Sequence, residues 1–189
     1  MSTVDYLQNI ITRFGIVLDE HDRYLELFHE YETQVEGWLK GELIPFFDNE
    51  KYESRLVDFN TEFNCGHGIV DYWLNVPDGP VTKEIWIELK HFHIGLQKGQ
   101  SWKASSYLAV KSNGIYHDVD KLTKIARGDK FVLILATKNP EYEKDGEGDW
   151  SKGVERFNAN FAPLHIESLT DPSNFPRSYF LGLLEVTSK

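Results

Sequence analysis

Residues 66–90 read GHGIVDYWLNVPDGPVTKEIWIELK, and the rest of the predicted fold is arranged around them. Alternating apolar residues on both sides of a segment rich in proline and glycine predict two strands joined by a turn at residues 77–82. Successive side chains of a strand point to opposite faces, so one face is expected to be apolar. The apolar face would carry Val70, Tyr72, Leu74, Ile85, Ile87 and Leu89. The opposite face would carry Asp71, Trp73, Trp86, Glu88 and Lys90.

The register of this hairpin brings two carboxylates together. If Val76 pairs with Lys83 across the turn, Asp71 lies directly opposite Glu88. The Cβ atoms of opposed residues are roughly 5 Å apart, and like charges at that spacing destabilise a sheet. We therefore expect a cation between the two carboxylates. It is either a lysine of the same face, for which Lys90 is the candidate, or a divalent metal ion.

The composition is that of a folded globular protein. With 189 residues, of which 41% are hydrophobic and 14% aromatic, the chain can bury one sizeable core, so we expect a single domain over residues 1–189. No apolar run is long enough to span a membrane, and no leader peptide is expected. A single cysteine, Cys65, excludes an internal disulfide and a cysteine-only zinc site. A cytoplasmic protein is the simplest interpretation.

The overall charge argues against broad, nonspecific binding of nucleic acids. The chain has 20 basic and 30 acidic residues and a net charge of -10. Nonspecific binding needs basic surface that releases counterions from the phosphate backbone. A nuclease is still compatible with this charge, because a local basic rim and bound metal ions can overcome the overall field.

Two helices and a strand are predicted before the hairpin. Apolar spacing predicts a short helix over residues 2–14, ended by Gly15, and a longer helix over residues 19–40. Pro45 is expected to stop helical structure. Strict alternation then predicts a half-buried strand over residues 55–63.

Two glutamates of the longer helix are candidate accessory ligands. Glu32 and Glu36 lie along or beside its apolar stripe. Most glutamates in such places are solvated helix positions. One that faced the carboxylate pair would instead add a ligand for a metal ion or for water.

Candidate substrate contacts lie on both sides of the hairpin. They are His67, His93, Lys98, Gln100 and Lys103. The last three belong to a locally basic segment after His93, which also carries Trp102 and Tyr107. This segment is either an ordinary solvated loop or an edge that contacts phosphates, with aromatic rings available for base stacking.

The remainder of the chain predicts one more helix and two more strands. A helix is expected over residues 115–126, followed by an unbroken apolar run at 131–136 that is typical of a strand buried on both faces. A strand, a helix and another strand form a crossover unit, so this strand should lie parallel to the one that carries Glu88. Residues 138–153 are charged and glycine-rich, which predicts an exposed loop, and residues 179–186 predict a final strand.

The order helix, strand, strand, strand, helix, strand resembles the PD-(D/E)XK nuclease superfamily and its restriction-endonuclease-like fold. The matching residues are Asp71 on the second strand and Glu88-Leu89-Lys90 on the third. The helix with the sequence DVDKL at residues 118–122 and the buried strand after it also lie where that core has them. The pattern covers roughly residues 20–137. The proline of the family's name is absent, since Val70 precedes Asp71, at a position that varies among members.

The resemblance implies an α/β fold with a central mixed β-sheet flanked by helices. Its αβββαβ core would be extended by an N-terminal helix and a C-terminal strand. It also implies a metal-dependent nuclease that hydrolyses phosphodiester bonds, with DNA as the expected substrate and a homodimer as one way to cut both strands.

The resemblance also assigns roles to the matching residues. Asp71 and Glu88 would hold Mg²⁺, for which Mn²⁺ would substitute, and the Leu89 carbonyl could add a ligand. Mg²⁺ prefers one or two carboxylates, with water and phosphate completing its octahedron. Lys90 would orient or deprotonate the attacking water and offset charge at phosphorus.

Three other interpretations remain open from the sequence. The protein could have the nuclease fold without catalysis and bind a protein partner, for which the acidic charge is an argument. It could be an unrelated small α/β binding protein in which Glu-X-Lys is accidental. Asp71 or Glu88 could form an ordinary surface salt bridge with Lys90, worth at most about 1 kcal/mol. A metal ion that contacts both carboxylates would favour the nuclease, whereas a side chain in the metal position would favour the inactive protein.

Overall fold

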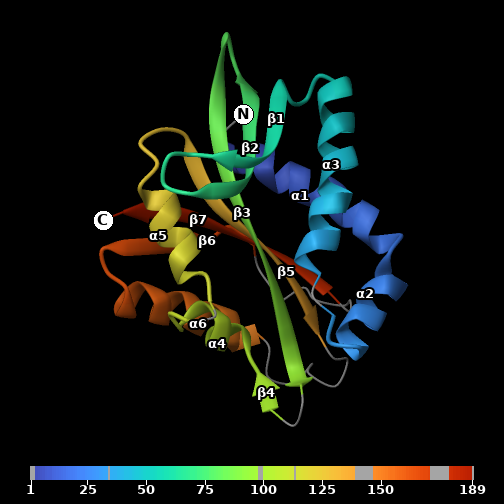
Figure 1. Cartoon of the computed structure of the whole chain (residues 1–189), viewed down its shortest axis with the longest axis vertical. Coiled ribbons are helices and arrows are strands. Elements are labelled where there is room, and N and C mark those ends of the chain that lie inside the picture. The colour runs from blue at the N-terminus through green and yellow to red at the C-terminus, as the bar shows by residue number, and fades with distance from the viewer. Residues whose placement is uncertain are drawn as a thin grey trace.

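A computed structural model describes residues 3–33, 35–97, 100–112, 114–138, 147–170 and 179–188. A six-stranded mixed sheet runs through the middle of the protein, with helices α1–α3 on one side and α4–α6 on the other (Figure 1). The predicted α/β class, a central mixed sheet flanked by helices, is therefore confirmed. Within the described residues, no helix is both long and apolar enough to cross a membrane.

The sheet begins as an antiparallel meander and continues with a parallel pair. Its strands, in spatial order, are β1 Asp58–Asn64, β2 Ile69–Asp78, β3 Val81–Gln97, β5 Asp129–Lys138, β7 Tyr179–Ser188 and β6 Leu164–Ser168. Only β3 and β5 are parallel, as predicted from the crossover through the intervening helix. The short β4, Gln100–Trp102, pairs with the far end of β3.

The N-terminal helices cover one face of the sheet, and their boundaries differ from those expected. They are α1 Thr3–Asp19, α2 Asp22–Glu30 and α3 Glu36–Tyr52. The predicted end at Gly15 is wrong because α1 continues until the buried Leu18 has joined the core. The predicted helix over residues 19–40 is also wrong. The chain breaks where Glu32 adopts a φ of 50°, and α3 begins at Glu36.

Pro45 lies inside α3, contrary to the prediction that it stops the helix. A proline within a helix removes one backbone hydrogen bond and crowds the preceding turn, at a cost of about 3 kcal/mol. Buried side chains on both sides of Pro45 offset this cost by packing against the sheet. They are Leu39, Leu43, Phe46 and Phe47. Tertiary packing therefore overrides a local signal that would otherwise end the helix.

The helices on the opposite face are α4 Ala104–Leu108, α5 Tyr116–Thr123 and α6 Glu147–Asn160. The predicted helix over residues 115–126 and the strands at 131–136 and 179–186 are confirmed in place. The loop predicted at residues 138–153 is wrong from Glu147 onward, where α6 begins, whereas residues 139–146 lie outside the described part of the chain.

Gly153 is a packing contact of α6 and not a loop signal. A Cβ atom at this position would lie 2.7 Å from Leu108 Cδ1 and 2.9 Å from Ser105 Cα, so glycine lets α6 approach α4 closely. Trp150 and Phe157 lie about one turn before and one turn after it, on the buried side of the helix.

The hairpin has the predicted register, with Val76 opposite Lys83 and Tyr72 opposite Ile87. Its apolar face does not continue to the beginning of β2, however. Tyr72 packs under the N-terminal helices, whereas Val70 packs in the second core beneath α5. The change of side occurs at Asp71, whose position opposite on β1 is Glu62, a residue with a φ of 51°. The prediction that Val70 shares the face of Tyr72 is therefore wrong, because the regular alternation of β2 is interrupted beside the irregular backbone of Glu62.

Candidate active site

Three carboxylates lie in one row across β1, β2 and β3. The β1–β2 register places Glu62 opposite Asp71. Continuation of the β2–β3 register by one position places Asp71 opposite Glu88, as the hairpin predicts. Opposed like charges destabilise a sheet, so this row needs counter-charges from elsewhere in the fold.

Lys40 of α3 supplies the counter-charge of Asp71. Its Nζ lies 2.6 Å from Asp71 Oδ1 and 3.4 Å from Glu62 Oε1. The other carboxylate oxygen of Asp71 accepts a hydrogen bond from the Leu89 amide at 2.8 Å. Burial alone would lower the pKa of Lys40, but its contacts with Asp71 and Glu62 outweigh burial and raise it. The ammonium is therefore retained at neutral pH.

Glu88 is the least satisfied member of the row. Its side chain is nearly buried, with the residue 3% exposed, and Lys121 Nζ of α5 lies 2.5 Å from its Oε1. Oε1 is buried, and the Lys121 ammonium is the cation in contact with it. Burial raises the pKa of Glu88 to about 8, with Asp71 and Asp118 adding to the rise and Lys121 opposing it. The carboxyl group can therefore hold a proton near neutral pH.

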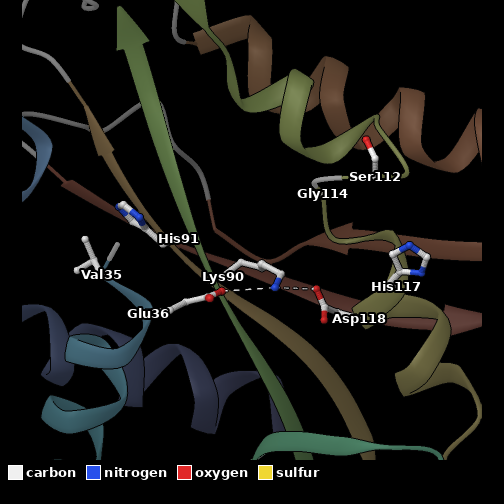
Figure 2. A pocket seen from close by; sticks show the side chains of 8 residues that line it. All are labelled: Val35, Glu36, Lys90, His91, Ser112, Gly114, His117 and Asp118. Atoms are coloured by element: carbon white, nitrogen blue, oxygen red, sulfur yellow. Dashed lines mark hydrogen bonds and ion pairs between the residues drawn. The ribbon is translucent and has the colours of Figure 1, made fainter. Parts of the chain in front are cut away.

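Lys90 is held between two further carboxylates. Its Nζ lies 3.2 Å from Asp118 Oδ2 and 3.4 Å from Glu36 Oε1, as the dashed lines in Figure 2 mark. Burial would lower the pKa of Lys90, but Asp118 and Glu36 outweigh it and raise the pKa. Burial also raises the pKa of Asp118, against the influence of Lys90. Lys90 is thus a fixed cation at the edge of the carboxylate row.

The structure separates the two glutamates that were predicted as accessory ligands. Glu36, at the first turn of α3, reaches Lys90. Glu32 lies in the break before α3, and its charge acts on His29 and His93 instead. Of the two, only Glu36 belongs to the candidate site.

The ion pairs around the row are unbalanced in charge. They join five carboxylates (Glu36, Glu62, Asp71, Glu88 and Asp118) to three lysines (Lys40, Lys90 and Lys121). With every group ionised, two negative charges remain, which one divalent cation would neutralise. The two helical lysines were missed as site residues. Their signal was their spacing from an acidic residue of the same helix, Glu36 before Lys40 and Asp118 before Lys121.

A hollow of about 330 Å³ opens beside Lys90. Glu36, His91, His117 and Asp118 are among its lining residues, and Figure 2 shows Lys90 reaching across it from β3. The lining is polar and carries both signs of charge. The hollow could therefore admit water and a polar ligand next to the Lys90 ammonium.

The predicted substrate contacts are dispersed. His67 is exposed in the turn between β1 and β2, and Lys103 is half-buried immediately before α4. His93 is only 8% exposed and packs against His29 and His91, because β3 continues as a strand where a loop was considered. Burial lowers the pKa of His93, which keeps it neutral.

Two of these contacts cannot be placed with their side chains. Lys98 lies outside the described residues, and Gln100 is described only as a residue of β4. The prediction that the exposed and half-buried members of the set contact substrate stays a prediction.

The candidate site offers a small set of oxygen atoms as possible metal ligands. Among the described residues, no group of three or more His, Cys, Asp or Glu side chains could hold a metal ion. Asp71, Glu88 and the Leu89 carbonyl are a smaller set, which suits Mg²⁺ because this ion keeps several waters and takes one or two carboxylates. The buried Glu88 oxygen and the excess negative charge both favour a divalent cation here.

No family model, curated protein or solved structure matches this chain. Its resemblance to the nuclease superfamily therefore depends on the positions of a few residues and on the order of helices and strands.

Proposed function

We propose that the protein is a metal-dependent nuclease that hydrolyses phosphodiester bonds, with DNA as substrate. One observation carries the proposal. Asp71 and Glu88 lie on adjacent strands at the point where the Leu89 amide binds Asp71, and Lys90 follows on the same strand. The connection after β3 adds support. Helix α5 contacts the row through Lys121, and β5 then pairs parallel to β3, which is the order of elements that the resemblance to the nuclease superfamily implies.

The chain's own residues have distinct roles in this proposal. Asp71, Glu88 and the Leu89 carbonyl would hold Mg²⁺, which supplies positive charge to the phosphate and acidifies a bound water. Lys90 is kept protonated by Asp118 and Glu36, so it suits the stabilisation of negative charge at phosphorus and the orientation of water. This favours an electrostatic role for Lys90 over removal of a proton from water.

A cleavage assay tests the proposal. The wild-type protein would be incubated with plasmid, linear duplex and single-stranded DNA in Mg²⁺ or Mn²⁺, beside Asp71→Asn and Lys90→Met. Each substitution should lower the cleavage rate about 100-fold or more, since each removes a group that acts on the transition state. The appearance of linear plasmid before nicked plasmid is exhausted would indicate that both strands are cut in one encounter, as a dimer would allow.

Lys83→Met is the matched control for Lys90→Met. Lys83 lies on the same strand and also pairs with a carboxylate, Asp129 Oδ2 at 2.6 Å, but it is near the hairpin turn and away from the row. Its substitution should leave cleavage within about twofold of wild type. A wild-type protein that cuts none of the substrates, or variants that cut as fast as it does, would refute the nuclease proposal.

A second function has one observation in its favour. Lys121 and Lys40 place ammonium groups on Glu88 and Asp71, and a side chain in the metal position is expected of a nuclease fold that has lost catalysis. Such a protein would bind a partner and would take up no Mg²⁺ or Mn²⁺. Isothermal titration calorimetry with either ion would separate the two functions, because only the nuclease is expected to bind the metal ion.

A further inference from the structure

Lys121 occupies a special place among the lysines of the site. It reaches from α5 to the most buried carboxylate, with Nζ 2.5 Å from Glu88 Oε1 and its own side chain 21% exposed. The same Nζ donates a hydrogen bond to the Ile69 carbonyl at 2.6 Å. Lys121 thus contacts two acceptors. A metal ion at the site would also use Glu88, whereas the Ile69 carbonyl at the beginning of β2 would remain available to Lys121.

The turn between β1 and β2 leaves space for the Lys121 side chain. Gly68 has a φ of 134°, and a Cβ atom there would lie 3.2 Å from Lys121 Cδ. A larger residue would crowd the aliphatic part of Lys121 as it passes toward Glu88. Glycine at this position therefore lets the turn between β1 and β2 lie against the lysine side chain.

We propose that Lys121 is the resident counter-cation of Glu88, which holds this carboxylate in the metal-free protein and sets the metal affinity by competing for it. The inference depends on the proposed function, since it assumes that Asp71 and Glu88 bind a divalent cation. Lys121 is then a positioning residue, because it acts through Glu88. When a metal ion takes the carboxylate, the Ile69 carbonyl keeps the ammonium at the edge of the site.

The competition predicts that removal of the lysine charge strengthens metal binding. Free energy used to break the Lys121–Glu88 pair is subtracted from the binding free energy of the metal, and the ammonium also repels the bound ion. Lys121→Gln keeps a long polar side chain but removes the charge. We expect it to bind Mn²⁺ about tenfold more tightly than wild type.

The experiment is a calorimetric titration of the metal-free full chain with Mn²⁺ in mildly alkaline buffer, where protons compete less for carboxylates. Lys124→Gln is the matched control. It lies one turn further along the same segment, and its Nζ pairs with Asp120 Oδ2 at 2.7 Å and not with the row. This control should bind Mn²⁺ as wild type does. Lys121→Met, which loses charge and hydrogen bonds together, is the second variant, and thermal unfolding of each protein verifies that it is folded.

The outcomes separate the inference from the proposed function. Tighter binding by Lys121→Gln with no change in Lys124→Gln supports the inference. Equal or weaker binding by both Lys121 variants overturns it while leaving a metal-binding wild type, and hence the nuclease proposal, intact. No binding by any folded protein overturns both.

Discussion

Glu50 on α3 and Glu88 on β3 are both almost fully buried, with 1% and 3% of their surface exposed, but their partners differ greatly. Glu50 accepts hydrogen bonds from two guanidinium groups, from Arg13 at 3.2 and 2.5 Å and from Arg55 at 3.1 and 3.0 Å. Glu88 has one lysine, Lys121, with Nζ 2.5 Å from Oε1, and the negative charge of Asp71 lies nearby.

The pKa values of the two carboxyl groups move in opposite directions. Burial would raise the pKa of Glu50, but Arg55 and Arg13 outweigh burial and lower it. Burial raises the pKa of Glu88 to about 8, and Lys121 does not compensate. A buried carboxylate with all its acceptor sites filled keeps its charge, and removal of that charge leaves its cations unpaired. One that is left short of donors is instead available to a proton or a metal ion.

For the proposed nuclease, the substitution with the largest expected effect is Glu88→Gln. It should lower cleavage about 1000-fold, which corresponds to about 4 kcal/mol of activation free energy, while its free energy of unfolding stays equal to wild type or rises. The stability is retained because burial and Asp71 favour the protonated form of Glu88, and glutamine has nearly the same shape as that neutral carboxyl group. Plasmid cleavage rates and urea unfolding would be measured on the same preparations. A variant that cleaves normally, or that is strongly destabilised, would remove the contrast with Glu50.

Glu50→Gln should show the reverse behaviour. We expect the free energy of unfolding to fall by about 2–3 kcal/mol, because Arg13 and Arg55 lose a shared charged acceptor in a buried position. Cleavage and Mn²⁺ affinity should stay within about twofold of wild type. Glu53→Gln is the control. Glu53 is half exposed, and its Oε2 lies as far as 3.7 Å from Arg55 Nη1, so this variant should unfold as wild type does. A loss of cleavage in folded Glu50→Gln would contradict the assignment of Glu50 to stability alone.

The two glutamates should also give opposite pH dependences of stability. The pKa of Glu88 is raised to about 8 in the folded protein, from 4.5, so the folded state binds the extra proton between these values. Its contribution to stability is therefore present at acid pH and is lost as the pH rises toward 8. The pKa of Glu50 is lowered, so its contribution is present above 4.5 and is lost as the pH falls through the folded pKa.

Urea unfolding of metal-free protein between about pH 5 and pH 8 checks this smallest effect. Over that range wild type should lose on the order of 2 kcal/mol more stability than Glu88→Gln. The difference between the two curves isolates Glu88, because His29 and His91, whose pKa values burial lowers to about 4 and 3, titrate in both proteins. Parallel curves would mean that Glu88 is ionised throughout.

The sequence predicted the centre of the sheet well because the signals there are local. Alternation and a proline–glycine turn specify the register of Val76 with Lys83, and that register alone brings Asp71 opposite Glu88. The unbroken apolar run of β5 and the helix before it were enough to predict its parallel pairing with β3.

The errors lie where packing between distant segments overrides a local signal. Pro45 is accommodated because its helical neighbours are buried, and Gly153 belongs to a helix because α4 needs a close approach. Glu32 breaks a helix that apolar spacing alone would continue. Residues of the same three types end helices or form loops in other contexts, so their type alone could not predict these outcomes.

Periodicity and short connections were enough to predict the α/β class and the β2–β3 register, and continuation of that register by one position puts Asp71 across from Glu88. Only the tertiary structure decided which cations meet these carboxylates. Lys40 and Lys121 come from helices on opposite faces of the sheet, and their arrival at the row depends on how each helix packs. The sequence likewise does not distinguish Glu50, which has two arginine partners, from Glu88, which has one lysine. The fold brings the donors to each buried carboxylate from distant segments.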